Sequence, residues 1–399
     1  MKNIISTLNL PDREVISAVK PLCFSEELSE DQAVDYFARA AWSLISEPGD
    51  RIAGRLISCM TAPRALGWLL GNISLPFTLD EFESQQLEKH RSVWKMRADY
   101  QQLLKSFQAA HHTGATLVVT DKYNKLQDEK PHILWVKGNS PSILLDTSQK
   151  VSIVGTRCCS YYGKSVTADI SYSLARKNYV IVSGGALGID GTAHMSALSA
   201  GKSTIVFFAG GVDWIYPRGN EALFSKICES GIIVSEMPCG SRPTKWRFLR
   251  RNRLIAAIPS AVVVTEAAAR SGSISTAYHA ADVQVPVGAV PGPINSPLSE
   301  GCNRLIRDRI AESVTCADDV VGLFAPLVVS PIQKDSFGLQ ASRIRVIDAL
   351  SKKYDRDISE ICRLSGMLFD DVSSLMRLLE LSGQVIRSGS GWRLSGRLR

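Results

Sequence analysis

The sequence predicts an α/β protein built around an extended Rossmann-like, doubly wound parallel sheet, with an N-terminal helical region and a C-terminal winged helix. Short runs rich in Val and Ile recur between residues 116 and 290, and segments of helical character separate them. Strands that are apolar on both faces, with helices between them, are typical of a parallel sheet covered on both sides. Near the C-terminus, helical segments precede a Gly-rich hairpin, which is the order of a winged helix-turn-helix.

Residues 1–110 are expected to form a helical accessory domain. Leu87, Trp94 and Tyr100 fall at loosely helical spacing, with charged residues between them. Aromatic side chains in such a pattern usually pack into a core. We therefore assign no chemistry to this region.

Residues 111–325 are expected to form the Rossmann-like domain. The predicted strands cover residues 116–120, 133–136, 151–154, 179–183, 204–208, 231–235, 261–265 and 285–290. In a doubly wound sheet, ligands bind beyond the carboxyl ends of the parallel strands. The segments that follow these runs are therefore where function is expected.

The C-terminal part divides into a linker and a small domain. Residues 326–340, which contain Pro326, Pro331 and Gly338, are expected to be a linker. Residues 341–399 predict a winged helix with a helix at 344–351, a second helix capped by Asp357, a turn at Gly366, a third helix, and hairpin strands at 384–387 and 392–394. The apolar face of the third helix consists of Val372, Leu375, Met376 and Leu379.

Acidic residues outnumber basic residues on that third helix, where Asp370, Asp371 and Glu380 accompany Arg377. A helix that reads the groove of duplex DNA is expected to be basic. We therefore expect the winged helix to contact a protein or to pack against the main domain.

The composition fits a soluble globular protein. The 399 residues allow two or three domains, and they are 45% hydrophobic and 21% charged with a net charge of +7. We expect a cytoplasmic protein without membrane contact, because no run of apolar residues spans a bilayer and no secretory leader is recognisable. The nine cysteines include no C-x-x-C pair, so we expect neither a disulfide framework nor a metal site. No cofactor is expected.

The tripeptide Gly163-Lys164-Ser165 invites comparison with a nucleotide-hydrolysing P-loop. That motif requires a Gly five residues before Gly163, where Cys158 stands. Its loop also needs small residues, whereas Tyr161 and Tyr162 occupy it. Both departures disfavour a P-loop.

The same stretch predicts a phosphate cradle of another kind. A strand at 151–154 is followed by the turn Gly155-Thr156-Arg157, and Ser160 is placed to cap the next helix. A helix N-terminus attracts anions through its unpaired N–H groups and its dipole. Arg157 would add a positive charge beside it.

Glycine-bearing turns also follow other predicted strands. They include Ser183-Gly184-Gly185, a segment with Arg218, and Ser271-Gly272-Ser273. Each turn alone is weak support for a ligand, because tight turns need glycine for geometry. A dinucleotide site is disfavoured, since G-x-G-x-x-G is absent after the first core strand and Ser183-Gly184 stand where a ribose-binding acid is expected. Together, the turns predict a phosphate-binding rim.

The segment K-W-R-F-L-R-R-N-R at 245–253 is expected to be a loop that binds nucleic acid. Five of its nine residues are cationic and two are aromatic. Cations follow a phosphate backbone, and rings stack on bases with little regard to sequence. The segment therefore predicts single-strand binding through Lys245, Trp246, Phe248, Arg250, Arg251, Asn252 and Arg253.

Over residues 110–316 the chain resembles the DNA-processing protein A (DprA/Smf) family. The motifs that carry the resemblance are G-T-R-x-x-S-x-x-G, S-G-G-A-x-G-I-D-x-x-A-H, Y-P-x-x-N, F-x-x-R-N-R-L-I-A, E-A-x-x-R-S-G-S-x-x-T-A and V-P-G-P with G-C-N-R-L-I, in the order of the family. The resemblance implies a homodimer that binds single-stranded DNA, protects it, and loads the RecA recombinase onto incoming strands during natural transformation.

The resemblance also implies roles for individual residues. Gly155 and Arg157 would hold a phosphate, with Ser183 and Gly184 beside them. Arg218 would lie on the positive rim, and Ser271-Gly272-Ser273 would complete the pocket. The residues of the DNA-contacting loop would be Phe248, Arg251, Asn252 and Arg253.

An enzymatic alternative is a nucleotide hydrolase of the related lysine-decarboxylase-like (LOG) family. Members of that family carry the motif P-G-G-x-G-T-x-x-E at their critical turn. No glycine turn of this chain has a Glu at that spacing. Glu236 and Glu266 are the candidates for a general base, but both stand at predicted strand ends, where carboxylates often stabilise helix starts. Asp190 is expected to be an N-terminal helix cap, and His194 a packed His. We therefore expect a binding protein without catalytic residues.

Overall fold

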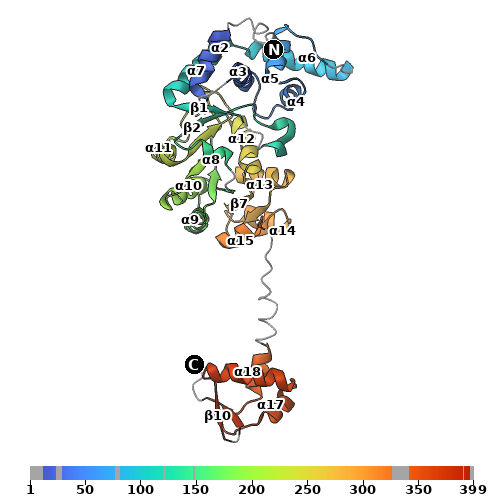
Figure 1. The fold of residues 1–399 in the computed structure, drawn as a ribbon, viewed down its shortest axis with the longest axis vertical. Helices are drawn as coiled ribbons and strands as arrows, with labels where there is room; N and C mark the ends of the chain where they lie inside the picture. Colours follow the sequence, from blue (N-terminus) through green and yellow to red (C-terminus); the bar gives the residue numbers. More distant parts are fainter. Residues whose placement is uncertain are drawn as a thin grey trace. The chain divides into compact units, whose positions relative to one another are not determined.

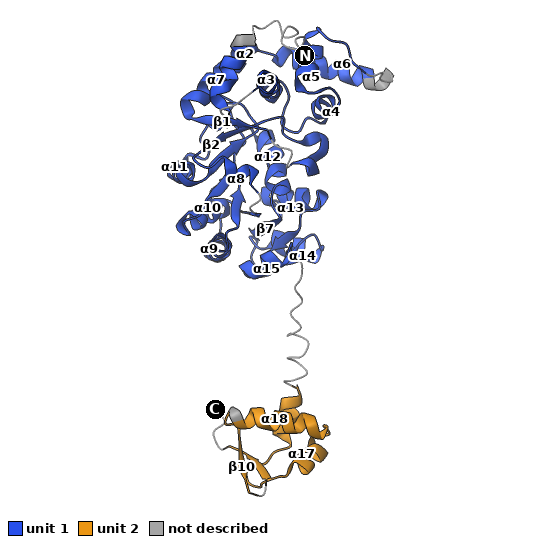
Figure 2. Ribbon diagram, viewed as in Figure 1, with its two compact units in different colours: residues 1–325 blue, residues 326–399 orange. Residues whose placement is uncertain are grey.

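The computed structural model describes residues 12–23, 29–76, 81–119, 123–146, 149–325, 341–389 and 391–395. The chain divides into two compact units, residues 1–325 and residues 326–399 (Figure 2). The predicted linker at 326–340 lies outside the described residues.

The described residues of unit 1 form a nine-stranded sheet with the order β1-β2-β6-β5-β4-β3-β7-β8-β9 (Figure 1). Neighbouring strands from β6 to β9 pair in parallel, and β1–β2 and β2–β6 pair antiparallel. The strands are β1 (Ala115–Val118), β2 (Leu134–Lys137), β3 (Lys150–Gly155), β4 (Val180–Ser183), β5 (Thr204–Phe207), β6 (Ile232–Ser235), β7 (Ala261–Glu266), β8 (Val287–Ala289) and β9 (Glu312–Ser313).

This sheet confirms the predicted doubly wound architecture and corrects it at both edges. All the predicted strands form, but β2 runs antiparallel to both of its neighbours, β1 and β6, so the sheet is mixed rather than wholly parallel. The short β9 was not predicted, because its two exposed residues carry no apolar pattern.

Helices cover both faces of the sheet. Val151 and Ile153 of β3 pack into a core with α9 and α10, whereas Val154 packs into a core with α12, α13 and α14. Alternation along a strand sends neighbouring side chains to opposite faces, so β3 needs apolar residues on both. The helices are α8 (Ser142–Leu145), α9 (Tyr161–Arg176), α10 (Ile189–Ser199), α11 (Glu221–Ser230), α12 (Lys245–Ala257), α13 (Gly272–Asp282), α14 (Glu300–Arg307) and α15 (Ala317–Gly322).

The N-terminal region is helical, as predicted, but it shares its core with the sheet. Phe107 stacks on Trp135 of β2 with ring centres 5.9 Å apart, and the Trp135 indole N–H donates to Ser43 Oγ at 3.3 Å. These helices therefore belong to the same compact unit as the sheet. They are α2 (Asp12–Val19), α3 (Glu30–Ile45), α4 (Arg51–Met60), α5 (Ala62–Leu70), α6 (Glu81–Arg97) and α7 (Tyr100–Thr113), and the short 3-10 segments of unit 1 are η1 (Lys20–Leu22), η2 (Asn124–Glu129) and η3 (Arg218–Asn220).

Unit 2 has the predicted order of three helices and a hairpin: a helix at 341–348, α17 (Ile358–Ser365), α18 (Phe369–Leu381), β10 (Val385–Ser388) and β11 (Gly391–Leu394). Asp357 caps α17 by accepting from the Glu360 N–H, and Gly366 ends it with a φ of 63°. The predicted apolar face of α18 lies in the core of the unit, together with Trp392.

Within the described segments, no helix combines the length and the apolar character needed to cross a bilayer.

Candidate nucleic-acid interface

The basic segment 245–253 belongs to a helix and not to a loop, which corrects the prediction. Helix α12 begins after Thr244, whose hydroxyl accepts from the Arg247 N–H at 3.2 Å. Leu254 and the three residues after it are buried and anchor the C-terminal half of the helix in the core. The helical period of 3.6 residues therefore distributes the cations over two faces.

One face of α12 is bound to the N-terminal region and to the end of β6. Arg247 makes two hydrogen bonds to the Glu47 carboxylate at 2.9 and 3.0 Å, and Arg250 donates to the Gly49 carbonyl at 2.8 Å. Arg253 is only 1% exposed and pairs with both carboxylate oxygens of Glu236 at 2.6 and 2.7 Å. Arg250 and Arg253 thus hold the fold together and do not line the pocket described next.

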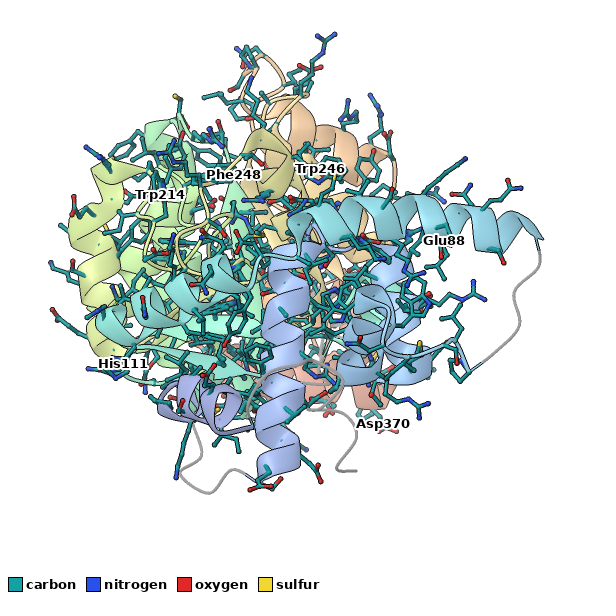
Figure 3. All side chains as sticks on the ribbon, turned by 90° about the horizontal axis from the view of Figure 1, so that it is seen from above. Glu88, His111, Trp214, Trp246, Phe248 and Asp370 are labelled. Carbon is teal, nitrogen blue, oxygen red and sulfur yellow. The ribbon has the colours of Figure 1, made fainter. Side chains whose placement is uncertain are left out.

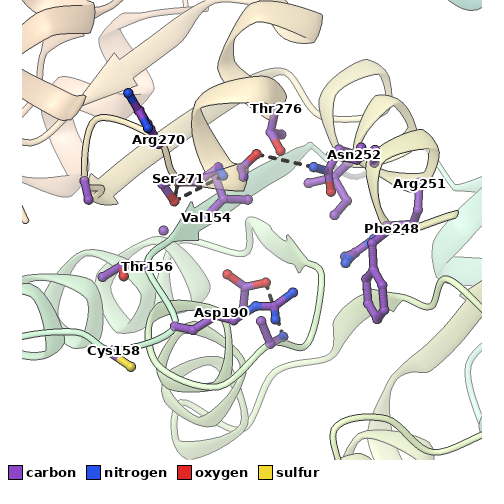
Figure 4. A pocket seen from close by; sticks show the side chains of 18 residues that line it. Val154, Thr156, Cys158, Asp190, Phe248, Arg251, Asn252, Arg270, Ser271 and Thr276 are labelled. Atoms are coloured by element: carbon purple, nitrogen blue, oxygen red, sulfur yellow. Dashed lines mark hydrogen bonds between the residues drawn. The ribbon is translucent and has the colours of Figure 1, made fainter. Parts of the chain in front are cut away.

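The opposite face of α12 lines a pocket of about 440 Å³, which we call the α12 pocket (Figure 4). Its wall is formed by the turn after β3, the start of α13 and the site-facing side of α12. It brings together the predicted residues Gly155, Thr156, Arg157, Phe248, Arg251, Asn252, Ser271, Gly272 and Ser273.

Arg251 is the central cation of the α12 pocket. It is 7% exposed, and its guanidinium lies 5.6 Å from the centre of the Phe248 ring. Among the described residues, its Nε and Nη1 have no hydrogen-bond partner. Burial and the charge of Arg157 lower the pKa of Arg251 to about 10, although the charge of Asp190 raises it. Arg251 therefore remains a cation at neutral pH. A buried cation with free donors is suited to bind an anion.

The Gly155–Arg157 turn is held from two sides. The Thr156 N–H donates to the Glu266 carbonyl at 2.7 Å, and the Thr156 carbonyl accepts from the Ile189 N–H at 3.2 Å. A side chain at Gly155 would lie 2.6 Å from Ile189, so the close packing of this turn requires glycine. Arg157 is exposed, with its guanidinium 5.8 Å from the Phe248 ring centre.

Ser160 caps α9 as predicted and is itself fixed by Glu266. The carboxylate accepts from the Ser160 N–H at 2.8 Å and from its hydroxyl at 2.6 Å. A side chain at Gly163 would lie 2.4 Å from the same carboxylate, which explains the glycine of the apparent P-loop motif.

The start of α13 supplies polar groups to the other side of the pocket. Ser271 caps the helix, and its hydroxyl lies 2.8 Å from that of Ser273. Asn252 donates to the Gly272 carbonyl at 3.3 Å and so ties α12 to α13 (Figure 4). The positive end of the α13 dipole therefore faces a pocket that already contains arginine.

Other predicted residues support the pocket or lie outside it. Ser183 is buried, and its hydroxyl donates to the Ile153 carbonyl at 2.6 Å. Gly184 lies against Arg251, because a Cβ there would be 1.8 Å from Nη1. Gly185 has a φ of 71° and packs against Phe224. These turn residues shape the site without lining the cavity. Arg218 is exposed on η3, also away from the lining.

Exposed rings lie on and beside α12: Phe248 lines the pocket, whereas the Trp246 ring lies 5.7 Å from the guanidinium of Arg250, on the other face of the helix. Trp246, at the start of α12, is 55% exposed, and the neighbouring Lys245 is exposed as well. The ring centre of Tyr216 lies 5.5 Å from that of Phe248. We call Trp214, Tyr216, Phe248 and Trp246 the aromatic rim. Figure 3 shows Phe248 between Trp214 and Trp246 in the view along the long axis.

Sequence reasoning missed several residues of this site. Trp214 and Tyr216 lie in a glycine turn after β5 that was recognised, but their rings were not selected. Asp190 and Thr276 line the pocket and belong to motifs that were already identified. Arg242 could not be selected, because only the fold brings its guanidinium to within 5.2 Å of the Trp214 ring centre.

The candidate acids and bases are engaged in structural contacts. Glu266 binds Ser160, and Glu236 binds Arg253. Burial lowers the pKa of His194 to about 3, and its Nδ1 pairs with Thr204 rather than with Asp190. Asp190 is not the predicted N-terminal cap, because it lies in the first turn of α10 after the N-cap Gly188 and accepts from the N–H groups of Gly184 and Ala186 in the preceding turn. Burial raises the pKa of this carboxyl. Across the described ranges, no cluster of His, Cys, Asp and Glu has the arrangement of a metal site.

Known proteins match this chain in sequence and in structure. The family described as DNA recombination-mediator protein A matches residues 116–325. A putative DNA processing protein DprA from Mycobacterium tuberculosis is 38% identical over 270 residues, covering 66% of this chain and 69% of that protein. The DNA processing protein DprA from Bacillus subtilis is 38% identical over 192 residues, covering 48% of this chain and 64% of that protein.

The solved structure of DNA processing protein A from Streptococcus pneumoniae is similar in fold. It aligns with a TM-score of 0.58 and 29% sequence identity, covering 73% of this chain and 98% of that chain. The family match includes every strand of the sheet after β1, together with α12 and the turns that build the pocket. The chain therefore belongs to the DNA recombination-mediator protein A family of DNA-processing proteins, the family that its motifs resemble.

Proposed function

We propose that this DNA-processing protein binds single-stranded DNA without sequence preference, protects incoming strands, and loads the RecA recombinase onto them during natural transformation and recombination. We further propose that it acts in the cytoplasm as a homodimer and catalyses no reaction itself. The observation that supports DNA binding most strongly is Arg251, a buried cation with free donors beside an aromatic ring.

The α12 pocket suits one or more phosphates of a polynucleotide. Arg157, Arg251 and Arg270 contribute three positive charges to its lining, against the single carboxylate of Asp190. Hydroxyls of the α13 start and backbone N–H groups add neutral donors. A phosphate beside Arg251 would offset the free-energy cost of its burial.

The aromatic rim favours a single strand over a duplex. Phe248 has guanidinium groups near it from both Arg157 and Arg251, and Trp246 presents a largely exposed ring. Bases of a single strand are free to stack on such rings, whereas bases of a duplex are already stacked on each other. Stacking is tolerant of sequence, because every base has a π face.

Unit 2 is proposed to contact protein rather than to read duplex DNA. The first turn of α18 carries the acidic residues Asp370 and Asp371, and Leu368 before it is strongly exposed. Negative charge at this position opposes a phosphate backbone.

Titration of labelled oligonucleotides, single and double stranded, at several salt concentrations tests the proposal. The wild type is expected to prefer single strands. Arg157→Ala and Arg251→Ala should each lower the slope of log K against log[salt] by about 0.7, the contribution of one phosphate in a single strand. Arg176→Ala removes the same charge from the far end of α9 and should leave the slope unchanged.

Equal affinity for duplex and single strand, or the same salt slope in all variants, would contradict the proposal. A nucleotide hydrolase remains the alternative function. It would be supported if nucleoside monophosphates were consumed while oligonucleotides failed to bind.

A further inference from the structure

We infer that Trp214 and Arg242 form a second base-stacking site, which binds the same DNA strand beyond the α12 pocket. The inference rests on the proposed function, because it extends the path of the strand that the pocket holds.

Trp214 and Arg242 form a pair at the surface of unit 1. The guanidinium of Arg242 lies over the Trp214 ring, 5.2 Å from its centre, and the indole is still 38% exposed. A large ring that is exposed beside a cation is typical of surfaces that bind planar ligands. Both members of the pair can stack on a base, and Arg242 can also bind a phosphate.

The loops that carry this pair are fixed before any ligand binds. The Gly240 N–H donates to both carboxylate oxygens of Asp213 at 3.0 and 2.8 Å, which joins the two loops. The backbone N–H of Trp214 donates to the Gly211 carbonyl at 2.9 Å. A backbone held in this way loses little conformational freedom on binding, so stacking contributes more to affinity.

The pair continues the site already described. Tyr216, two residues from Trp214, contacts the Phe248 ring, and Phe248 lies beside Arg251 in the pocket. The Arg242 carbonyl accepts a hydrogen bond from Arg247 Nη1 at 3.0 Å, so α12 itself positions the loop. The path from the pocket to Trp214 thus has the guanidinium groups of Arg251 and Arg242 at its two ends and the rings of Phe248 and Tyr216 between them, which suits the phosphates and stacked bases of one strand.

The occupant that this chemistry selects is a base of single-stranded DNA. The only carboxylate described within the Trp214 turn, that of Asp213, is engaged by the Gly240 N–H. An aromatic ring beside a cation, without an unengaged carboxylate, attracts a polyanion that has planar groups. It has no anionic group that could bind a basic peptide.

Oligothymidylates of two lengths test the inference, one of about 4 nucleotides and one of about 15, near the limits of typical single-strand binding sites. Trp214→Leu should weaken binding of the long oligonucleotide about tenfold and leave binding of the short one unchanged, because one stacked base contributes on the order of 1–3 kcal/mol. Arg242→Ala should also lower the salt slope for the long oligonucleotide by about 0.7, which Trp214→Leu should not do. The Arg242 contact to Arg247 uses the backbone carbonyl and survives this change.

Tyr172→Leu is the matched control, because Tyr172 is an exposed ring on α9, outside the pocket lining and the rim. The inference fails if Trp214→Leu binds the long oligonucleotide as tightly as the wild type does, or if its affinity falls by the same factor for both oligonucleotides. In either case, tight binding by the wild type and weak binding by Arg251→Ala would leave the proposed function intact. Failure of the wild type to bind either oligonucleotide would instead remove the proposed function.

Discussion

Replacing Gly184 by Ala tests the role of Arg251 without removing a charge. A Cβ at Gly184 would lie 1.8 Å from Nη1 of Arg251 and 2.7 Å from its Cζ. The backbone of Gly184 has no left-handed φ, so the added methyl group acts through this contact and not through backbone strain. The guanidinium must therefore leave its place between Gly184 and the Phe248 ring.

The size of the effect follows from what the guanidinium does there. Inserting a methyl group into a filled site costs about 1–3 kcal/mol of folding free energy. A hydrogen bond to a charged group contributes about 1.5–3 kcal/mol, which corresponds to roughly 10- to 100-fold in Kd. We expect Gly184→Ala to bind single-stranded oligonucleotides more weakly by about that factor, with a salt slope lower by about 0.7.

Fluorescence anisotropy with a labelled oligonucleotide provides the measurement, and a double-mutant cycle with Arg251→Ala provides the control. If the methyl group acts through Arg251, Gly184→Ala adds no further loss once Arg251 is Ala. Gly322→Ala is the matched substitution, because a Cβ there meets nothing within 4 Å. Independent, additive losses, or wild-type binding by Gly184→Ala, would refute the assigned position and role of Arg251.

Two further predictions concern the other face of α12. Arg253→Met leaves the buried Glu236 without its partner and should lower the free energy of unfolding by about 3–5 kcal/mol in urea titrations. Its salt slope for DNA should stay at the wild-type value, and a lower slope would show that Arg253 contacts the strand after all. Burial alone would raise the pKa of Glu47, but hydrogen bonds and charges from Arg247 and Arg97 lower it below 4.5. Glu47→Gln should therefore lower stability by about 1 kcal/mol near pH 7, after allowance for solvent screening. A carboxylate with a depressed pKa stabilises the fold fully above its unfolded pKa, so this difference should start to decrease as the pH falls below about 4.5 and should vanish once the pH is below the folded-state pKa of Glu47. A difference in stability that does not decrease as the pH is lowered would contradict the ion pair.

The sequence predicts the sheet well, because its signals are local. The Val and Ile runs mark the strands, and the spacing of Ser160 after Arg157 places the start of α9 correctly. The capping of α17 by Asp357 and its end at Gly366 were predicted in the same way, because Asp is favoured at the start of a helix and Gly at its end.

The basic segment was assigned to the site as a whole because it was taken for a loop. In a helix, Phe248 and Arg251 are three residues apart and share a face, whereas Arg250 and Arg253 follow another. The helical period would have separated the two sets. It would not have identified Glu47 or Glu236, since these partners come from other elements and are fixed only by the tertiary fold.

Photo-crosslinking tests the central claim most directly, namely that a single strand follows the α12 pocket and the aromatic rim. An oligonucleotide that carries 4-thiothymidine is irradiated in complex with the full chain, and the modified residues are located by mass spectrometry. We predict crosslinks at Phe248, Trp246 and Tyr216, and their loss in Arg251→Ala. Crosslinks confined to the N-terminal helices or to unit 2, unchanged in Arg251→Ala, would contradict it.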